Sequence, residues 1–341
     1  MPKGRGLYLH VPWKRGGVPP AAEGRYRAGV RAEAALLAAR GLAIETRVVS
    51  FAVGGGDPLL LPEESIRSLL AEAADVFRPA PGCERTCEGA VRSIERGKLR
   101  ALREAGFDRL CATGTEGEEA ERVRAAVREA REAGFETVAL DLAVTADVGS
   151  LLESAAFPAH DLDHVSLRET SGPPLGEEEW VRAYREASEI LGGLGLERYE
   201  ITHFARPGKR SRHLLLLHAG GDVIGLGAGA LTSLGRLRRR NLADPERYAE
   251  AARAGSLPIG EGEELSDTER VRERVFLGLR RSRGVDPRSI GRGLALDHPP
   301  LSGEAIRRLA EAGFLAWAGR RIVLTERGIV AAERIVLELL S

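Results

Sequence analysis

The first part of the chain carries two recurring patterns of apolar and polar positions. Residues 7–11 alternate with a period of two, as a half-buried strand does, and Pro12 ends this segment. Residues 26–40 place apolar side chains at helical spacing, and Gly41 stands where a helix C-terminal cap is expected. Residues 46–52 form an apolar, β-branched run, which predicts a buried strand. The chain therefore begins as strand, helix, strand.

The same order recurs further along the chain. Residues 102–110 and 130–138 both follow the order helix, glycine, aromatic residue, strand. Further strands are predicted at 85–88, 107–113, 138–144, 164–167 and 198–202. Strands that alternate with helices of about 10–15 residues are typical of parallel βα units. Six such units fit up to Phe204, so we predict an α/β fold with an open, partial (βα)6 barrel of the TIM type over residues 1–204.

The pattern changes after the predicted barrel. Residues 205–264 contain a glycine-rich stretch, predicted as a bridge, and then a helix within 241–255. From residue 265 the order is helix, helix, short hairpin, helix, which predicts a small winged-helix-like module over residues 265–341. We expect this module to pack against the mouth of the barrel.

Composition narrows the class of protein. The 50 Lys and Arg residues balance 50 Asp and Glu residues, whereas a nucleic-acid-binding protein usually has a basic excess, so no nucleic-acid partner is expected. The chain has no run of about 18 apolar residues and no signal-peptide pattern, which predicts a cytoplasmic protein without a membrane span. Its three cysteines are an odd number, so a disulfide framework is not expected.

The opening strand and the Gly/Pro-rich loop after it are the first candidate site, because loops at the carboxyl ends of barrel strands carry the chemistry. Tyr8, His10, Pro12 and Trp13 match the Tyr-Ile-His-Ile-Pro-Phe strand that opens one known family. The chain thereby resembles the radical-SAM proteins of the HemW/HemN type, which are the oxygen-independent coproporphyrinogen III oxidases and their haem-chaperone relatives. The resemblance implies a radical-SAM-type barrel followed by the family's C-terminal domain.

The family's Cys-x3-Cys-x2-Cys motif is absent at its expected place. The three positions hold Lys14, Val18 and Ala21. A four-iron cluster is held by thiolates, which these side chains do not supply. We therefore expect no four-iron four-sulfur cluster, no reduction of S-adenosylmethionine and no radical chemistry.

A cluster relocated to the cysteines that are present is not expected. Cys83, Cys87 and Cys111 have a spacing unlike that of the family motif. Cys87 and Glu88 are neighbours on one predicted strand and face opposite ways. Buried free thiols are the ordinary interpretation.

The glycine-rich loop after the second predicted strand matches a second family motif. Gly54, Gly55, Gly56 and Asp57, followed by Pro58, correspond to the Gly-Gly-Gly-Thr-Pro loop that holds the amino group of S-adenosylmethionine in the family. The resemblance implies that these residues bind the cofactor. His10 is a further candidate cofactor-binding residue. A tight turn would explain the glycines equally well. Without a cluster to anchor its methionine, S-adenosylmethionine is not expected to bind well.

Two acidic residues match strand-end acids of the family. Glu88 and Asp141 are retained, whereas the ribose-contacting Gln is replaced by Thr115. Glu88 and Asp141 are candidate acid/base groups for an enzyme. They could equally be structural, since a buried acid is usually paired.

The second half of the chain matches the family more closely. Residues 198–208 and 220–230 follow the family's sequence at most positions. Of the family motif His-Asn-x-x-Tyr-Trp, associated with haem binding, His213 remains, while His203 and His218 are new. A histidine beside an apolar wall is a plausible axial ligand of haem iron, so these three are the candidate haem ligands.

We therefore expect a cluster-less relative of the family that binds haem or another tetrapyrrole as a carrier, chaperone or regulator, with a haem-acceptor protein as its partner. One alternative is an enzyme that reuses the barrel cavity without iron–sulfur chemistry, with Glu88 and Asp141 as its acid/base groups. The others are a pseudoenzyme that acts through protein contacts and the family's oxygen-independent coproporphyrinogen III oxidase activity, which the missing cysteines disfavour.

Overall fold

The computed structural model describes residues 4–14, 16–42, 47–114, 119–155, 157, 161–169, 175–292, 294 and 301–340. Within these residues, six βα units follow one another in the order that the sequence predicts. They are β1 (Arg5–Val11), α1 (Pro20–Ala39), β2 (Val48–Gly55), α2 (Glu63–Phe77), β3 (Glu84–Ala90), α3 (Arg96–Glu104), β4 (Arg109–Thr113), α4 (Ala120–Glu132), β5 (Thr137–Ala143), α5 (Val148–Ala155), β6 (His164–Arg168) and α6 (Glu177–Gly193). Two 3-10 turns, Pro58–Leu60 and Val91–Ser93, follow β2 and β3. Thr115 lies outside the described residues.

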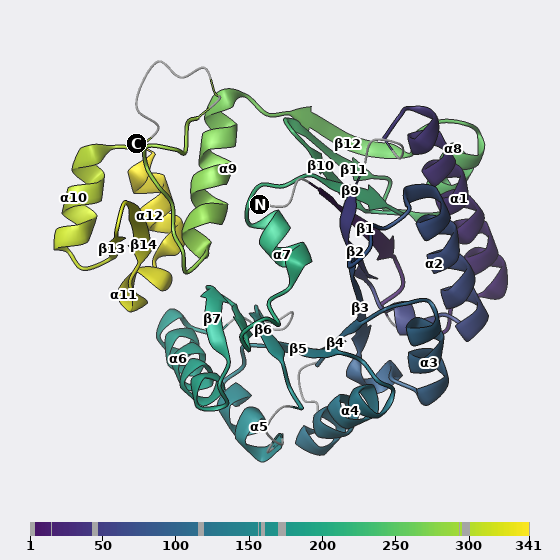
Figure 1. Ribbon diagram of the computed structural model, residues 1–341, viewed down its shortest axis with the longest axis horizontal. Coiled ribbons are helices and arrows are strands. Elements are labelled where there is room, and N and C mark those ends of the chain that lie inside the picture. Colours follow the sequence, from purple (N-terminus) through teal and green to yellow (C-terminus); the bar gives the residue numbers. More distant parts are fainter. Residues whose placement is uncertain are drawn as a thin grey trace.

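Strands β1 to β6 are parallel and pair in chain order. On one side of them the antiparallel strands β8 (His203–Ala205) and β7 (Glu197–Glu200) follow β6. On the other side β9 (Val223–Leu226) runs parallel to β1, and then come β10 (Leu231–Leu234), β11 (Leu237–Asn241) and β12 (Ile259–Glu264). Figure 1 shows the strands curving around an open interior, with the helices of the βα units on the outside. The predicted α/β fold with a partial barrel is confirmed.

Residues 205–264 are more than a bridge. In the described chain they add four strands to the main sheet, and α8 (Pro245–Arg253) packs on α1. These strands span only four to six residues each, and glycines interrupt them, so they lack the long alternation that would have marked them as strands. The division of the chain at residues 204 and 264 stays a prediction.

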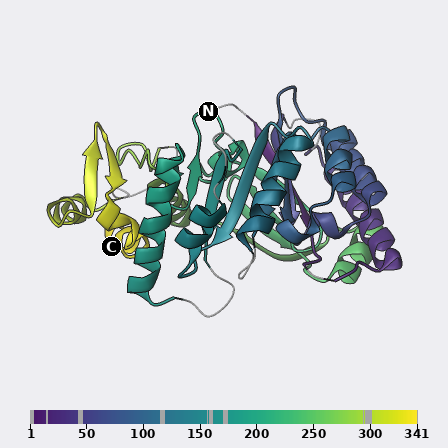
Figure 2. The same cartoon turned by 90° about the horizontal axis from the view of Figure 1, so that it is seen from below.

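The C-terminal module has its own core. It contains α9 (Asp267–Arg280), α10 (Gly303–Glu311), the hairpin of β13 (Leu315–Ala318) and β14 (Arg321–Leu324), α11 (Glu326–Ile329) and α12 (Ala332–Leu339). Most of its buried side chains form a cluster separate from that of the barrel, whereas Ile329 of α11 belongs to the barrel cluster. Figure 2 shows it at one end of the molecule, beside α6.

The module is fixed to the edge strand β7 by backbone hydrogen bonds. The N–H of Ile201 donates to the carbonyl of Arg280 at 2.9 Å, and the N–H of Ser282 donates to the carbonyl of Tyr199 at 3.1 Å. These bonds hold the end of α9 against the barrel.

The short helix α7 (Arg212–Leu217) lies within the ring of strands (Figure 1). The side chain of Ser211 caps its first turn, and the carboxylate of Glu84 on β3 accepts hydrogen bonds from the N–H groups of Arg212 at 2.9 Å and His213 at 3.2 Å. This anchoring places His213 inside the barrel.

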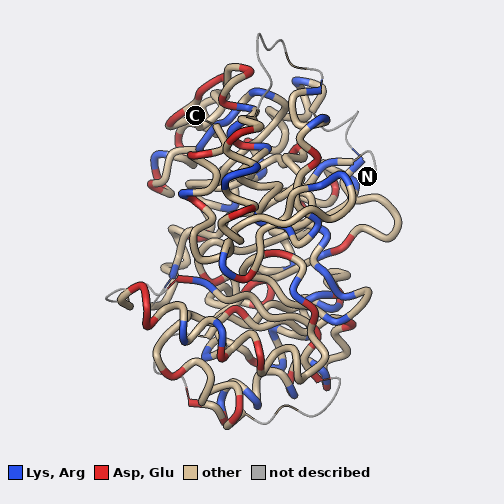
Figure 3. The backbone as a smooth tube through the Cα atoms, turned by 90° about the vertical axis from the view of Figure 1, so that its left-hand side faces the viewer, with Lys and Arg blue, Asp and Glu red and all other residues tan. Residues whose placement is uncertain are grey.

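Basic and acidic residues are interspersed along the whole chain rather than gathered into separate regions (Figure 3). This distribution agrees with the zero formal net charge of the sequence. Among the described helices, none is both long enough and apolar enough to cross a membrane.

Candidate functional site: a polar cavity inside the barrel

A cavity of about 960 Å³ opens inside the barrel. Strands β2 to β6, the start of α7, and the junction between α11 and α12 form its wall. Ligand pockets in proteins have volumes of roughly 300–1,000 Å³, so the cavity is large enough for a sizeable small molecule.

The wall of the cavity is polar because of the alternation of side chains along the strands. Thr86 and Glu88 of β3 line the cavity, whereas Cys87 between them lies in the core with the helices. On β6, His164 and Arg168 line the cavity in the same way. A closed barrel interior is filled mainly by Val, Ile and Leu. The charged wall therefore indicates a binding site rather than a packed interior.

The glycine-rich loop after β2 packs tightly against its surroundings at the mouth of the barrel. The N–H of Gly56 donates to the carbonyl of Val11 at 2.7 Å, which ties the loop to the end of β1. A Cβ atom on Gly54 would lie 1.9 Å from Oε2 of Glu88, so a larger residue there would displace this carboxylate. The N–H of Gly55 donates to the same carboxylate. The glycines thus allow Glu88 to approach the backbone.

Asp57 holds this loop in place. Its carboxylate accepts hydrogen bonds from the N–H groups of Leu59 at 3.1 Å and Ala90 at 3.2 Å, and from the hydroxyl of Ser93 at 2.6 Å. Asp57 is buried, and these contacts explain its presence without a ligand. Cofactor binding by the loop stays a prediction.

His10 lies between the glycine-rich loop after β2 and a second glycine-rich turn, Gly227 to Gly229, after β9. Its ring is packed against Gly55, and its carbonyl accepts a hydrogen bond from the hydroxyl of Tyr26. Burial chiefly, and the positive charges of Lys14 and Arg240, lower the pKa of His10. The role of His10 in cofactor binding stays a prediction.

The residues at the family's cysteine positions do not fit an iron–sulfur cluster. Lys14 is exposed after β1, Val18 packs against the barrel core, and Ala21 is exposed in the first turn of α1. A four-iron cluster requires thiolate ligands, and these side chains provide none.

Two of the three cysteines of the chain lie on opposite faces of the sheet. Cys87 lies in the core behind the sheet, whereas Cys111 lines the cavity on its other face. Burial raises the pKa of Cys83 to about 11 and also raises those of Cys87 and Cys111, so the metal-free thiols stay protonated. That no cluster is relocated to these cysteines stays a prediction.

Glu88 and Asp141 both line the cavity. Burial, together with the negative charge of Asp141, raises the pKa of Glu88 to about 7. Burial raises the pKa of Asp141 to about 6, although Arg168 opposes this shift, its Nε lying 3.4 Å from Oδ1 of the carboxylate. The two acids thus share one electrostatic environment and titrate near neutral pH, as acid/base groups do.

His213, one of the three histidines singled out by the sequence, lines the cavity, as His203 also does. Its Nδ1 lies 3.1 Å from Oγ of Ser50, which leaves Nε2 for a ligand. The ring of Tyr8 stacks on it with centroids 5.9 Å apart. Burial lowers the pKa of His213 to about 4, so the ring is neutral near pH 7 and able to bind a metal.

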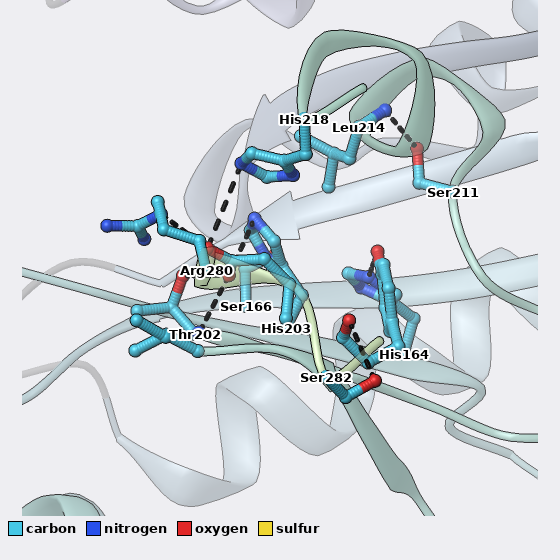
Figure 4. A network of polar contacts seen from close by, with 12 residues as sticks. His164, Ser166, Thr202, His203, Ser211, Leu214, His218, Arg280 and Ser282 are labelled. Carbon is cyan, nitrogen blue, oxygen red and sulfur yellow. Dashed lines mark hydrogen bonds and ion pairs between the residues drawn. The ribbon is translucent and has the colours of Figure 1, made fainter. Parts of the chain in front are cut away.

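His203 and His218 are brought together at Glu200 instead. Their Nε2 atoms each lie 3.8 Å from an oxygen of this carboxylate. Figure 4 shows the imidazole rings of His203 and His218 close together. His203 also lines the cavity through its position on β8, whereas His218 lines a second, smaller cavity of about 370 Å³ beside the C-terminal module.

Sequence reasoning did not identify several residues of the site. Arg109, His164, Arg168 and Arg280 line the cavity, and Glu200 joins the two histidines. The alternating polar residues of β6 could have been detected from the sequence. Arg280 could not, because its place in the wall depends on how the C-terminal module packs.

Comparisons with known proteins agree with the fold and the motifs. Residues 265–331 match the model of the HemN C-terminal domain family. The chain is 30% identical to the heme chaperone HemW of Mycobacterium tuberculosis, over 98% of this chain and 95% of the relative. It is 26% identical to HemW of Bacillus subtilis, over 81% of each chain, and 26% identical to the oxygen-independent coproporphyrinogen III oxidase of Cereibacter sphaeroides, over 79% of this chain and 71% of that protein.

A solved structure has the same fold. Coproporphyrinogen III oxidase (HemN) of Escherichia coli, described as a radical SAM enzyme, superposes with a TM-score of 0.81 over 99% of this chain and 90% of the other, at 19% identity. The resemblance inferred from the sequence is thereby confirmed: the chain belongs to the HemW/HemN-type family and has its radical-SAM fold.

Proposed function

We propose that this protein binds haem, or a related tetrapyrrole, in the barrel cavity and delivers it to an acceptor protein without performing radical chemistry. The HemW relatives are named heme chaperones, which supports a haem-related role. The proposal rests on one observation, the neutral imidazole of His213 with Nε2 free at the wall of a large cavity.

The arginines of the cavity favour a ligand with carboxylates, such as the propionates of haem. Nη1 of Arg109 donates to the carbonyl of Lys209 at 2.9 Å, while its buried Nη2 has no hydrogen-bond partner among the described residues. Arg168 donates through Nη2 to the carbonyl of Gly114 at 2.8 Å and also faces Asp141. Guanidinium groups bind carboxylates in a fixed, often bidentate geometry, so Arg109 supplies a donor that lacks an acceptor.

Apolar groups complete the wall on the side of α6, α7 and the C-terminal module. Trp180, Leu214, Ile329 and Val330 line the cavity there. A porphyrin presents two apolar faces and an edge with charged groups, and a cavity with an apolar wall, an imidazole and guanidinium groups is complementary to it.

In this proposal the protein generates no radicals, because its residues supply no ligands for an iron–sulfur cluster. Lys14, Val18 and Ala21 occupy the cysteine positions, and elsewhere Cys87 and Cys111 lie on opposite faces of the sheet. The proposed role is therefore that of a carrier or chaperone.

Anaerobic purification, an iron and sulfide assay, and haem titration of the same sample test the proposal. We expect no stoichiometric iron or sulfide, and one-to-one haem binding with a Soret band. His213→Ala should weaken haem binding at least about tenfold, because it removes the axial ligand. His218→Ala, a histidine outside the wall of the large cavity, is the matched control and should leave the affinity unchanged. Stoichiometric iron and sulfide, or haem affinity unaffected by His213→Ala, would contradict the proposal.

The raised pKa values of Glu88 and Asp141 favour a second candidate, an enzyme that uses the same cavity. In that case, Glu88→Gln would abolish conversion of the bound tetrapyrrole while leaving its affinity unchanged. A carrier would not convert the bound tetrapyrrole, with or without this substitution.

A further inference from the structure

We propose that Glu200, His203 and His218 form a binding site for one divalent first-row transition-metal ion, separate from the haem ligand proposed above. These residues come from three elements: the end of β7, the start of β8 and the C-terminal cap of α7. One ligand atom of each lies within 4.8 Å of those of the other two.

The geometry directs both imidazoles to the carboxylate. Nε2 of His203 lies 3.8 Å from Oε2 of Glu200, and Nε2 of His218 lies 3.8 Å from Oε1. The ring centroids of the two histidines are 5.6 Å apart, and Figure 4 shows the rings converging. The distance of 3.8 Å from Nε2 of His218 to Oε1 is too long for a hydrogen bond and slightly longer than the separation of two ligands that share an ion with bonds of about 2.1 Å. Binding an ion would require side-chain shifts that bring the three ligand atoms, now within 4.8 Å of one another, to that spacing.

The second ring nitrogen of His203, but not that of His218, has the outer partner that a metal-bound imidazole usually has. Nδ1 of His203 lies 2.9 Å from Oγ of Ser166, which fixes the orientation of the ring and leaves Nε2 as the ligand atom. Nδ1 of His218 is buried without a hydrogen-bond partner in the described part of the chain. Burial lowers the pKa of His203 to about 4 and that of His218 in the same direction, so both rings are neutral near pH 7, as metal binding requires.

Arg280 competes for the carboxylate and offers the alternative explanation, an ion pair that fixes the C-terminal module. Its Nε donates to Oε1 of Glu200 at 2.5 Å, while the N–H and hydroxyl of Thr202 donate to Oε2 at 2.7 and 2.9 Å. Each carboxylate oxygen has two lone pairs, so Oε2 is fully used and Oε1 keeps one lone pair for an ion. The guanidinium charge repels a cation, so the site should bind less tightly with Arg280 than without it.

The ligand set defines the class of ion. Two imidazoles and one carboxylate suit Zn²⁺, Co²⁺ or Fe²⁺, whereas Mg²⁺ and Ca²⁺ prefer oxygen ligands alone. Three protein ligands leave at least one coordination position open, which is the arrangement of exchangeable rather than purely structural sites. His203 lines the large cavity and His218 lines the smaller one, so the ligand cluster lies between the two cavities.

Titration of EDTA-treated, haem-free protein with Co²⁺ tests the site, because bound Co²⁺ has visible absorption bands. We expect one ion per chain, displaced by Zn²⁺. His203→Ala and His218→Ala should each weaken binding about 100-fold or more, and Ser166→Ala by about 10-fold, as loss of an outer partner does. Arg280→Gln should tighten binding. His10→Ala on β1, outside the cluster, is the control and should bind as the unsubstituted protein does.

Two outcomes would overturn the inference: no stoichiometric uptake of Co²⁺, or uptake that His203→Ala and His218→Ala leave intact. A loss of uptake in Arg280→Gln with the fold retained would also contradict it. None of these measurements involves haem or His213, so their failure is distinguishable from failure of the proposed haem carrier.

Discussion

Glu33 and Glu88 are two carboxyl groups with the same raised pKa, about 7, in two regions of the barrel with different roles. Glu33 on α1 is buried on the outside of the sheet and is surrounded by donors. Its carboxylate accepts hydrogen bonds from the N–H of Gly227 at 2.9 Å, from Nδ2 of Asn241 at 2.6 Å and from the hydroxyl of Tyr248 at 2.6 Å. Burial raises its pKa, and these three donors limit the shift.

Glu88 has the opposite surroundings. It lines the cavity, accepts a backbone hydrogen bond from Gly55, and faces the like charge of Asp141. The donors around Glu33 connect α1, the turn after β9, β11 and α8, whereas Glu88 points into an open space. A raised pKa alone therefore does not identify a functional acid; its partners do.

The largest expected effect is on stability at Glu33. Glu33→Ala leaves three buried donors without an acceptor and should lower the free energy of unfolding by about 3–5 kcal/mol. Urea unfolding monitored by circular dichroism measures this. Glu88→Ala is the matched control and should cost less, because it removes a group that faces the cavity. Equal costs for the two variants would remove the distinction between the two regions.

A smaller effect of opposite sign is expected at Glu88. Because its pKa is raised in the folded state, the folded protein binds more protons than the unfolded chain between about pH 4.5 and 7, and stability falls as pH rises through this window. Glu88→Gln removes this loss of stability, so it should raise the free energy of unfolding at pH 8 by about 2 kcal/mol. This gain is smaller than the free energy equivalent to the full pKa shift, because the cavity admits water.

The same substitution should change the stability much less at pH 4.5, where the Glu88 carboxyl is protonated in the folded state and about half protonated in the unfolded chain. Denaturant unfolding at the two pH values checks both expectations. Glu33→Gln at pH 8 is the comparison. It should not stabilise the protein, because the N–H groups of the new amide would face the donors of Asn241 and Tyr248. Stabilisation by Glu33→Gln but not by Glu88→Gln would contradict the distinction between Glu33, held by hydrogen-bond donors, and Glu88, which faces the cavity.

The smallest expected effect is a change in the pKa of Glu88 that Glu33 does not share. Asp141→Asn removes the like charge beside Glu88 and should lower the pKa of Glu88 toward its ordinary value, by less than one unit because burial is the larger cause. The pKa of Glu33 should not change. Carboxyl ¹³C chemical shifts followed through a pH titration report both groups, and an unchanged Glu88 pKa would show that Asp141 does not act on it.

Much of the fold could be predicted from the sequence because long, periodic segments carry it. The helix of α1 has a helical period, β2 is a continuous apolar run, and the alternation along β3 correctly separates Cys87 from Glu88. Strands β9 to β12 could not be recognised in the same way, because they are short and depend on pairing with distant strands, and β9 and β12 also contain glycine.

The site could be predicted only in part. Residues that point inward from the strands, such as Glu88 and Asp141, follow from strand alternation and the family motifs. The meeting of His203 with His218 at Glu200 depends on α7 folding back into the ring of strands, and sequence spacing does not reveal this.

The attachment of the C-terminal module to β7 has a consequence for solubility. β7 and β12 are the two edges of the main sheet, and an unprotected edge offers its free backbone groups to other chains. β12 is exposed and carries Glu261, Glu263 and Glu264, which discourage the addition of a further strand. β7 relies instead on the backbone bonds of Ile201 and Ser282 with the end of α9. The module thus acts as a cover against aggregation, and a chain that ended before residue 265 would present a strand edge that invites self-association.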